Sequence, residues 1–328
     1  MREQVLMIGG EAEWKSEGLF SYLTDSGRSS LRLLLRSGFR EKRFLIPDYF
    51  CKVIVEVLDE HDVSYTFYKV REDLSFDIAD VMRNDFDVFY QINYFGQRQD
   101  LGVIQNSGKW IVEDGVFLPD IEPPPGASNW IGFNSFRKIS PLADGSILKS
   151  TCELSADNIR HEEAAFASLK YKAKQIKYDY LHKNLYSENV YLALFGEAEE
   201  LADKQRDIYS ISSCSMFNLL NFYTRLEREY AVRRENYKVL DEVLNPLSIP
   251  LDAEYPALYV LSVDQRDKLR EYLYTQRIFL PAHWPNTYGI KNELYNRVIS
   301  IPLDSRYNQA DMQRVAGHIR AFFNIDQA

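Results

Sequence analysis

The amino-acid sequence predicts an α/β fold, with a mostly parallel mixed sheet between helices and a smaller α+β part. In the first half, short apolar runs rich in β-branched and aromatic residues alternate with stretches of helical spacing, which is typical of parallel strands joined by helices. From about residue 156 the pattern changes to long charged helices and then to an α+β tail. We therefore expect a large α/β domain over residues 1–150, and a helical linker with a small α+β domain over residues 151–328.

The elements of the first half are predicted in order from their hydrophobic periodicity. A helix follows the Ser-Gly turn at Ser26, and residues 44–47 (FLIP) form a buried strand. Residues 49–58 have helical spacing, although their β-branched valines weaken that prediction. The remaining expected elements are strands over residues 63–70, 86–92, 109–112, 130–133 and 146–148, and a helix over residues 76–82.

The second half is predicted to be mainly helical, because apolar positions recur at helical spacing between charged residues. Long helices are expected over residues 158–183, 188–206 and 213–244. The tail is expected to contain strands over residues 257–261 and 297–301 and helices over residues 263–274 and 309–323.

Composition and charge argue against several classes of function. The 39 basic and 48 acidic residues give a net charge of −9, so we expect no nucleic-acid partner, which would need a basic face. We expect no membrane partner, because no run of 18 apolar residues is present. The apolar stretch Val5–Ile8 is too short for a signal-peptide core, which predicts a cytoplasmic protein. Three distant cysteines and five histidines without metal-ligand spacing predict neither a disulfide framework nor a metal site.

The segment SGRSSL (Ser26–Leu31) opens a predicted helix. Free backbone N–H groups and the positive end of the helix dipole suit a phosphate there, and Arg28 adds a permanent charge with bidentate geometry. An ordinary N-cap with a glycine turn explains the same residues. Both interpretations are open for this segment taken alone.

Two further candidates follow predicted strands, where the ligand site of a parallel sheet lies. Asp114 ends an apolar strand and would face that site, with a solvated Asp-Gly turn as the alternative. Lys138 follows the strand at residues 130–133, beside Ser135 and Arg137. A nearby cation in a partly buried cleft lowers the pKa of an amine and favours its neutral, nucleophilic form, whereas a surface loop lysine is the alternative.

Together the three segments meet the needs of pyridoxal phosphate, which are a phosphate cup, a carboxylate for the pyridinium nitrogen and a lysine for covalent attachment. The chain also resembles the sugar aminotransferase family commonly labelled DegT/DnrJ/StrS, of the fold type I pyridoxal phosphate enzymes, and more closely a short branch of it. The matching pieces run in family order over almost the whole chain: IGGE near the start, SGRSSL, LIPDYFC, FYKV, NYFGQ, IVED, SFRKISPLADGSIL, RRENY and ISIPLDSRYNQADMQRVAGHI.

The resemblance implies a role for each matching residue. Lys138 would bind the cofactor covalently and move protons, and Asp114 would pair with the pyridinium nitrogen. Tyr49 would stack on the ring, although the usual position of the stacking residue in the family falls on Cys51. The remaining implied contacts are Gly27, Arg28, Ser29 and Ser135 for the phosphate, and Tyr94 and His283 for the substrate.

Two positions depart from the family pattern. Phe117 stands where the family commonly has Gln or His. The stretch IYSISSCS replaces an Asn-Tyr-Arg loop that reaches the phosphate from the partner subunit, which leaves Ser210 or Ser212 as substitutes in an implied homodimer. A local loop that caps the next helix is the alternative interpretation of these serines.

The resemblance implies a pyridoxal phosphate-dependent aminotransferase. Its donor would be an amino acid, by resemblance glutamate, and its acceptor a nucleotide-linked keto-sugar used in surface polysaccharide or related glycan synthesis. The alternative hypothesis is a catalytically altered relative that binds the cofactor or a sugar as a sensor or scaffold without transaminating. The departures at Phe117 and Ser210 motivate that alternative.

Overall fold

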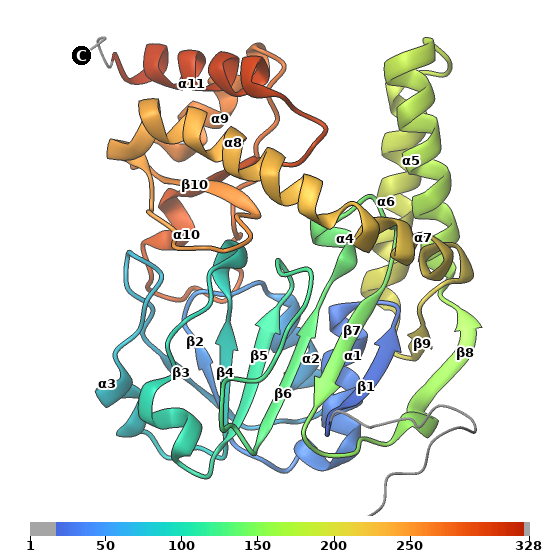
Figure 1. The fold of residues 1–328 in the computed structure, drawn as a ribbon, viewed down its shortest axis with the longest axis vertical. Helices are drawn as coiled ribbons and strands as arrows, with labels where there is room; N and C mark the ends of the chain where they lie inside the picture. The colour runs from blue at the N-terminus through green and yellow to red at the C-terminus, as the bar shows by residue number, and fades with distance from the viewer. Residues whose placement is uncertain (1–17, 325–328) are drawn as a thin grey trace, which may run out of the picture.

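The computed structural model describes residues 18–324 of the chain, so the IGGE segment at residues 8–11 lies outside the described residues. Figure 1 shows a large sheet at one end of the molecule, with the C-terminal elements and a long helical hairpin at the other end. The sheet has seven strands in the order β1-β7-β6-β5-β4-β2-β3. Their bounds are β1 Phe20–Thr24, β2 Phe44–Pro47, β3 Tyr65–Tyr68, β4 Val88–Ile92, β5 Trp110–Gly115, β6 Trp130–Asn134 and β7 Ser146–Ser150.

The centre of the sheet is parallel and its β1 edge is antiparallel. Strands β3, β2, β4, β5 and β6 run parallel, whereas β7 pairs antiparallel with both β6 and β1. Every residue of β4 and β6 is buried, as expected of strands covered on both faces. The α/β fold class with a mostly parallel mixed sheet is therefore confirmed.

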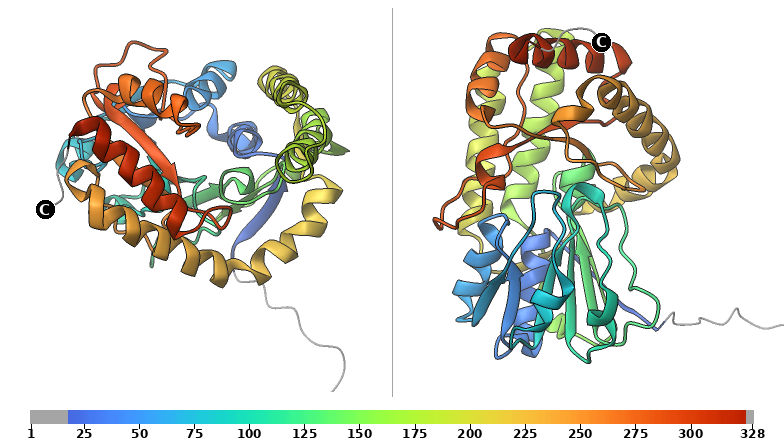
Figure 2. Two further views of the ribbon diagram at one scale, coloured as in Figure 1. Left: turned by 90° about the horizontal axis from the view of Figure 1, so that it is seen from above. Right: turned by 90° about the vertical axis from the view of Figure 1, so that its left-hand side faces the viewer.

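Helices follow several strands of the large sheet along the chain, as expected of an α/β fold. Helix α1 (Gly27–Leu34) continues into a short π-helical turn at Leu35–Phe39, and α2 (Val53–Glu60) packs beside it on the same side of the sheet (Figure 2). The other short helices are α3 (Ile78–Met82) and α4 (Phe136–Ile139). Additional 3₁₀ turns lie at Tyr94–Gly96, Gly102–Asn106, Ala156–Asn158 and Asn245–Leu247.

The second half forms a hairpin and a second apolar core. Helices α5 (Ala165–Lys183) and α6 (Glu188–Lys204) pack together as a hairpin, and the parallel strands β8 (Ile159–Glu163) and β9 (Ile208–Ser210) flank its base. The antiparallel pair β10 (Leu258–Ser262) and β11 (Val298–Pro302) packs with three helices around the second core. These helices are α8 (Leu226–Leu244), α9 (Arg266–Thr275) and α11 (Gln309–Phe323). Two other helices of the second half are α7 (Ser213–Thr224) and α10 (Leu294–Arg297).

Several elements differ from those expected. The single helix expected over residues 213–244 is interrupted at Arg225, where φ is −104° and ψ is 0°. Just before this break the Thr224 hydroxyl donates to the carbonyl of Asn221, a local bond that competes with the helical ladder. Residues 159–163 form strand β8 instead of the start of a helix. Strands β1 and β9 were not predicted. Within residues 18–324 no helix is both long and apolar enough to cross a membrane.

Candidate active site

A pocket lies at the carboxyl ends of the central strands, where the sheet topology predicts a ligand site. In the sheet register, Asp114 of β5 stands beside Ile92 of β4 and Phe133 of β6, and all three line the pocket. The N-terminus of α1 and the α4 turn that follows β6 close one side. The base of the α5–α6 hairpin and Trp284 provide further walls.

Asp114 is a buried acid at one end of this pocket. Its carboxylate accepts a hydrogen bond from the Tyr90 hydroxyl at 2.8 Å and one from the Val116 amide at 3.2 Å. Burial raises the pKa of Asp114 to about 6, against the lowering effects of these hydrogen bonds and of nearby Lys138. The carboxylate is therefore fixed in position, and a cationic N–H group brought beside it would relieve the cost of its burial.

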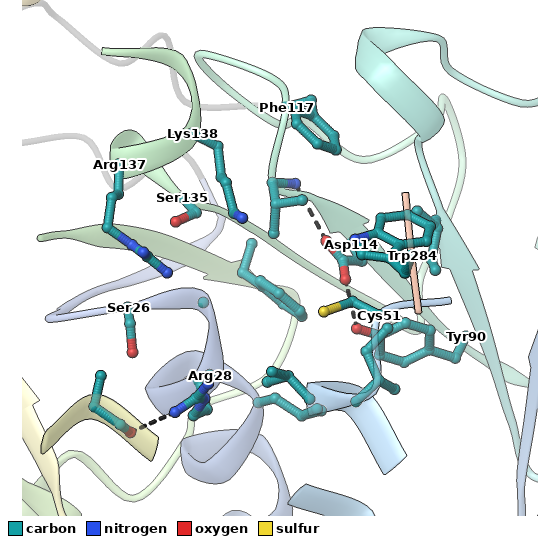
Figure 3. A pocket seen from close by; sticks show the side chains of 18 of the residues that line it. Ser26, Arg28, Cys51, Tyr90, Asp114, Phe117, Ser135, Arg137, Lys138 and Trp284 are labelled. Carbon is teal, nitrogen blue, oxygen red and sulfur yellow. Dashed lines mark hydrogen bonds between the residues drawn. The ribbon is translucent and has the colours of Figure 1, made fainter. Parts of the chain in front are cut away.

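Lys138 extends from the α4 turn into the pocket, on the side where Asp114 lies (Figure 3). The turn is held by a hydrogen bond from the Phe136 amide to the carbonyl of Gly145 at 3.0 Å. Gly145 has φ of +108°, and a Cβ atom there would stand 2.6 Å from the Ile211 side chain, so glycine is required. The Lys138 side chain is exposed at the open side of the pocket, yet desolvation by the pocket walls, followed by the charge of Arg137, lowers the pKa of its amine. At a given pH, a larger fraction of this amine is therefore neutral than of an ordinary lysine.

The opposite end of the pocket is an anion-binding end. Ser26 caps α1 by accepting the Ser29 amide at 3.2 Å, and Gly27 places bare backbone against the pocket. Figure 3 shows Ser26, Arg28, Ser135 and Arg137 gathered on this side, with Lys138 between them and Asp114. A helix N-terminus with two guanidinium groups suits a phosphate. The pocket therefore has an acidic end, a basic end and an amine between them.

The predicted ring-stacking residue does not line the pocket. Tyr49 is fully buried behind it, where its hydroxyl donates to the His283 carbonyl and its ring packs on Tyr94 at 5.6 Å between centroids. Cys51 and Trp284 line the pocket next to Asp114 instead (Figure 3). Cys51, the position on which the family's usual stacking residue falls, is therefore the one of the two that reaches the pocket.

Several other predicted contacts also lie outside the pocket lining. Ser29 is buried beneath the turn, and Tyr94 donates its hydroxyl to the Tyr49 carbonyl. His283 packs its ring against Phe95 and contacts the Ser300 hydroxyl through Nδ1 at 3.1 Å. Burial and the charge of Lys138 lower the pKa of His283 to about 3, so the imidazole is neutral.

The serines of the IYSISSCS stretch also lie outside the pocket lining. Ser210 belongs to β9. Ser212 caps α7, and its hydroxyl donates to the buried Asp144 carboxylate at 2.7 Å. The structure thus gives Ser212 the local capping role, whereas a contact of Ser210 with a partner subunit stays a prediction.

Some pocket residues were not assigned from the sequence. The sequence places Arg137 only as a neighbour of Lys138, and it gives no signal for Trp284. Phe166, Ala202 and Gln205 reach the pocket from the hairpin, and no sequence signal connects them with it. Among residues 18–324 no group of three or more His, Cys, Asp or Glu side chains is placed to hold a metal ion.

Comparisons with known proteins reveal a likeness of fold. No family model matches the sequence, and no curated protein matches it. The structure is similar to S. venezuelae DesV, with a TM-score of 0.66 at 14% identity, covering 94% of this chain and 85% of that chain. It is similar to a DegT DnrJ EryC1 StrS aminotransferase from Brucella abortus, with a TM-score of 0.63 at 15% identity, covering 92% of this chain and 85% of that one.

A third similar structure is Helicobacter pylori PseC, an aminotransferase involved in the biosynthesis of pseudoaminic acid. Its TM-score is 0.65 at 14% identity, and the match covers 93% of this chain and 86% of that chain. The chain therefore has the fold of fold type I aminotransferases.

Proposed function

We propose that this protein is a pyridoxal phosphate-dependent aminotransferase of the DegT/DnrJ/StrS type, which moves an amino group from an amino acid to a keto-sugar. The observation that carries the proposal is the polarity of the pocket, in which Lys138 lies between the buried acid Asp114 and the basic end formed by α1, Arg28 and Arg137. The similarity of the fold to sugar aminotransferases supports it.

The residues present fit pyridoxal phosphate. The α1 N-terminus, Ser26, Ser135 and the arginines would hold the phosphate, and the buried carboxylate of Asp114 would keep the ring nitrogen protonated. When bound, the cofactor supplies an electron sink for the carbon that bears the substrate amine. Cys51 and Trp284 would confine the ring.

Lys138 would act as the base of the reaction. Because burial and Arg137 lower the pKa of its amine, a larger fraction of the amine is neutral near neutral pH and able to accept a proton. After taking the proton from the donor amino acid, the resulting ammonium can return it at a neighbouring carbon. His283 would not compete for this proton, since the low pKa of its imidazole keeps it neutral.

We further propose L-glutamate as the donor and a nucleotide-linked keto-sugar as the acceptor, for glycan synthesis in the cytoplasm. The test is a half-reaction. Protein loaded with pyridoxal phosphate is mixed with L-glutamate, and release of 2-oxoglutarate is measured together with loss of the absorbance of the bound cofactor. We expect stoichiometric release from the wild type and none from Lys138→Ala.

A second candidate function is cofactor or sugar binding without transamination. Phe117 favours it, because this apolar ring lines the pocket at a position where the resemblance predicts Gln or His. Under that alternative, pyridoxal phosphate binds the wild type but glutamate yields no 2-oxoglutarate. The half-reaction therefore separates the two candidates.

A further inference from the structure

The two arginines at the basic end of the pocket are each paired with a carboxylate of α6. Arg28 Nη2 lies 2.8 Å from Asp203 Oδ1, and Arg137 Nη1 lies 3.0 Å from Glu199 Oε1. The two acids are four residues apart, so they lie on the same face of α6, the face that contacts the two arginines. The hairpin thus places two anionic groups on the cations that a phosphate would use.

We infer that Glu199 and Asp203 are built-in competitors of the cofactor phosphate, which hold Arg28 and Arg137 until the phosphate replaces them. The inference rests on the proposed function, because it assumes that the ligand of this end is a phosphate. It assigns to α6 a role in setting the affinity of the site.

Exposure of the carboxylates makes the exchange favourable. The side chains of Glu199 and Asp203 are 51% and 53% exposed, so each pair is a surface ion pair that contributes at most about 1 kcal/mol. A phosphate carries up to two charges and offers several oxygen acceptors to the guanidinium groups and to the α1 N-terminus. Its bonds with these groups are therefore stronger than the pairs they replace.

The carboxylates also keep partners after the exchange. Glu199 forms a second ion pair, in which its Oε1 lies 2.6 Å from Lys170 Nζ. The Lys170 side chain is only 3% exposed. Burial, followed by the charge of Arg137, lowers the pKa of Lys170 to about 8, so Glu199 is the group that compensates its charge. Asp203 is hydrated by its exposure. Only the guanidinium groups need to move, and α6 can stay in place.

A purely structural role of the pairs makes the opposite prediction. If the pairs serve to fasten α6 to the pocket, then loss of either carboxylate loosens the site and weakens binding of the cofactor. If the carboxylates compete with the phosphate, their loss tightens binding. The direction of the change in affinity therefore decides between the two roles.

The experiment is calorimetric titration of the cofactor-free protein with pyridoxal phosphate, with pyridoxal and with inorganic phosphate. We expect Glu199→Gln and Asp203→Asn to lower the Kd for pyridoxal phosphate and for phosphate by roughly threefold to tenfold, and to leave the Kd for pyridoxal unchanged. We expect Arg28→Gln and Arg137→Gln to raise the first two constants by tenfold or more.

Controls come from an ion pair outside the pocket lining. Arg43 pairs with Asp87 at 3.0 Å, so Arg43→Gln and Asp87→Asn remove the same chemical groups without touching the pocket and should leave all three constants unchanged. Thermal unfolding of each variant confirms that it is folded before its binding is compared.

The possible outcomes separate this inference from the proposed function. Unchanged or weaker binding of pyridoxal phosphate by both carboxylate variants would overturn the competitor role, and equal binding of pyridoxal phosphate and pyridoxal by the wild type would overturn it too. Failure of the wild type to bind either pyridoxal compound would instead contradict the proposed function.

Discussion

Burial of the Asp114 carboxylate lowers the free energy of unfolding of the protein that carries it. The carboxylate is buried, and the pKa rises to about 6 because the charged form is poorly solvated there. In the unfolded chain the same group has its ordinary pKa near 3.8. The difference implies that the charged carboxylate destabilises the cofactor-free protein at neutral pH.

We therefore predict that Asp114→Asn stabilises the cofactor-free protein by about 2–3 kcal/mol at pH 8, at 1.36 kcal/mol for each pKa unit. Below about pH 3 the carboxyl is mostly protonated in both states, and the difference nearly vanishes. As pH rises to about 6 the unfolded state loses its proton first, so the stability of the wild type falls relative to the variant. Urea unfolding of both proteins at pH 3 and pH 8 checks this. A variant less stable than the wild type at pH 8 would show that the Tyr90 bond outweighs burial.

The same substitution should lower the rate of amine transfer. A neutral amide cannot hold a proton on the ring nitrogen, and loss of that ion pair costs a few kcal/mol in the transition state, roughly a hundredfold or more in rate. We expect Asp114→Asn to bind pyridoxal phosphate yet to release 2-oxoglutarate from glutamate at least about a hundredfold more slowly. Turnover at the rate of the wild type would mean that another residue serves the ring nitrogen.

At the scale of elements, the segment that follows the lysine turn is fastened to α7 by a buried acid. Asp144 accepts hydrogen bonds from the amide of Ser212 at 2.7 Å, from its hydroxyl at 2.7 Å, and from the hydroxyl of Ser215. Its neighbour Gly145 supports the turn that carries Lys138. The packing of α7 and the position of the lysine are thus connected through two consecutive residues.

We predict that Asp144→Ala destabilises the protein by about 3 kcal/mol, because three buried donors lose their acceptor. Chemical denaturation measures the change, and Asp252→Ala, at an exposed position, serves as the control. The variant should also bind pyridoxal phosphate more weakly. A loss below about 0.5 kcal/mol would show that water replaces the carboxylate.

The sequence predicted those elements whose pattern is set by burial on one or two faces. The parallel strands at residues 44–47, 88–92 and 130–134 are continuous buried runs, and the helix over residues 309–323 has one apolar stripe and a capping box. Strand β9 is only three residues long. Strand β1 is half-exposed and its pairing with β7 spans more than a hundred residues. Neither has a local pattern that identifies it.

Part of the site could be predicted for a similar reason. Asp114 lies at the end of β5, and Ser135 and Lys138 follow β6, so the carboxyl edge of the sheet brings them together. Tyr49 could not be assigned correctly, because the side that a residue faces after a strand depends on the loop. The hairpin residues that approach the arginines come from α6, and nothing in their sequence records that contact.

At the scale of the whole molecule, α7 presents an apolar face to solvent. Phe217 is 76% exposed and Leu220 is 74% exposed, and Met216 on the same helix is also exposed. Large exposed apolar groups at neighbouring positions of a helix are typical of an interface. This face therefore supports the expectation of a homodimer.

We predict a particle of about twice 38.3 kDa in light scattering at micromolar concentration. The double variant Phe217→Asp, Leu220→Asp should shift the mass to that of one chain, since charges on an interface are costly to desolvate. A wild type that scatters as one chain would contradict the dimer. A dimeric double variant would place the interface elsewhere.

The most direct test of the proposed cofactor site is covalent trapping at Lys138. The purified protein is mixed with pyridoxal phosphate, reduced with borohydride, digested and mapped by mass spectrometry. The pocket geometry predicts that the pyridoxyl label lies on the peptide that contains Lys138, and that Lys138→Ala carries no label above background. A label on another lysine, or equal labelling of the variant, would contradict the assignment of this pocket as the pyridoxal phosphate site.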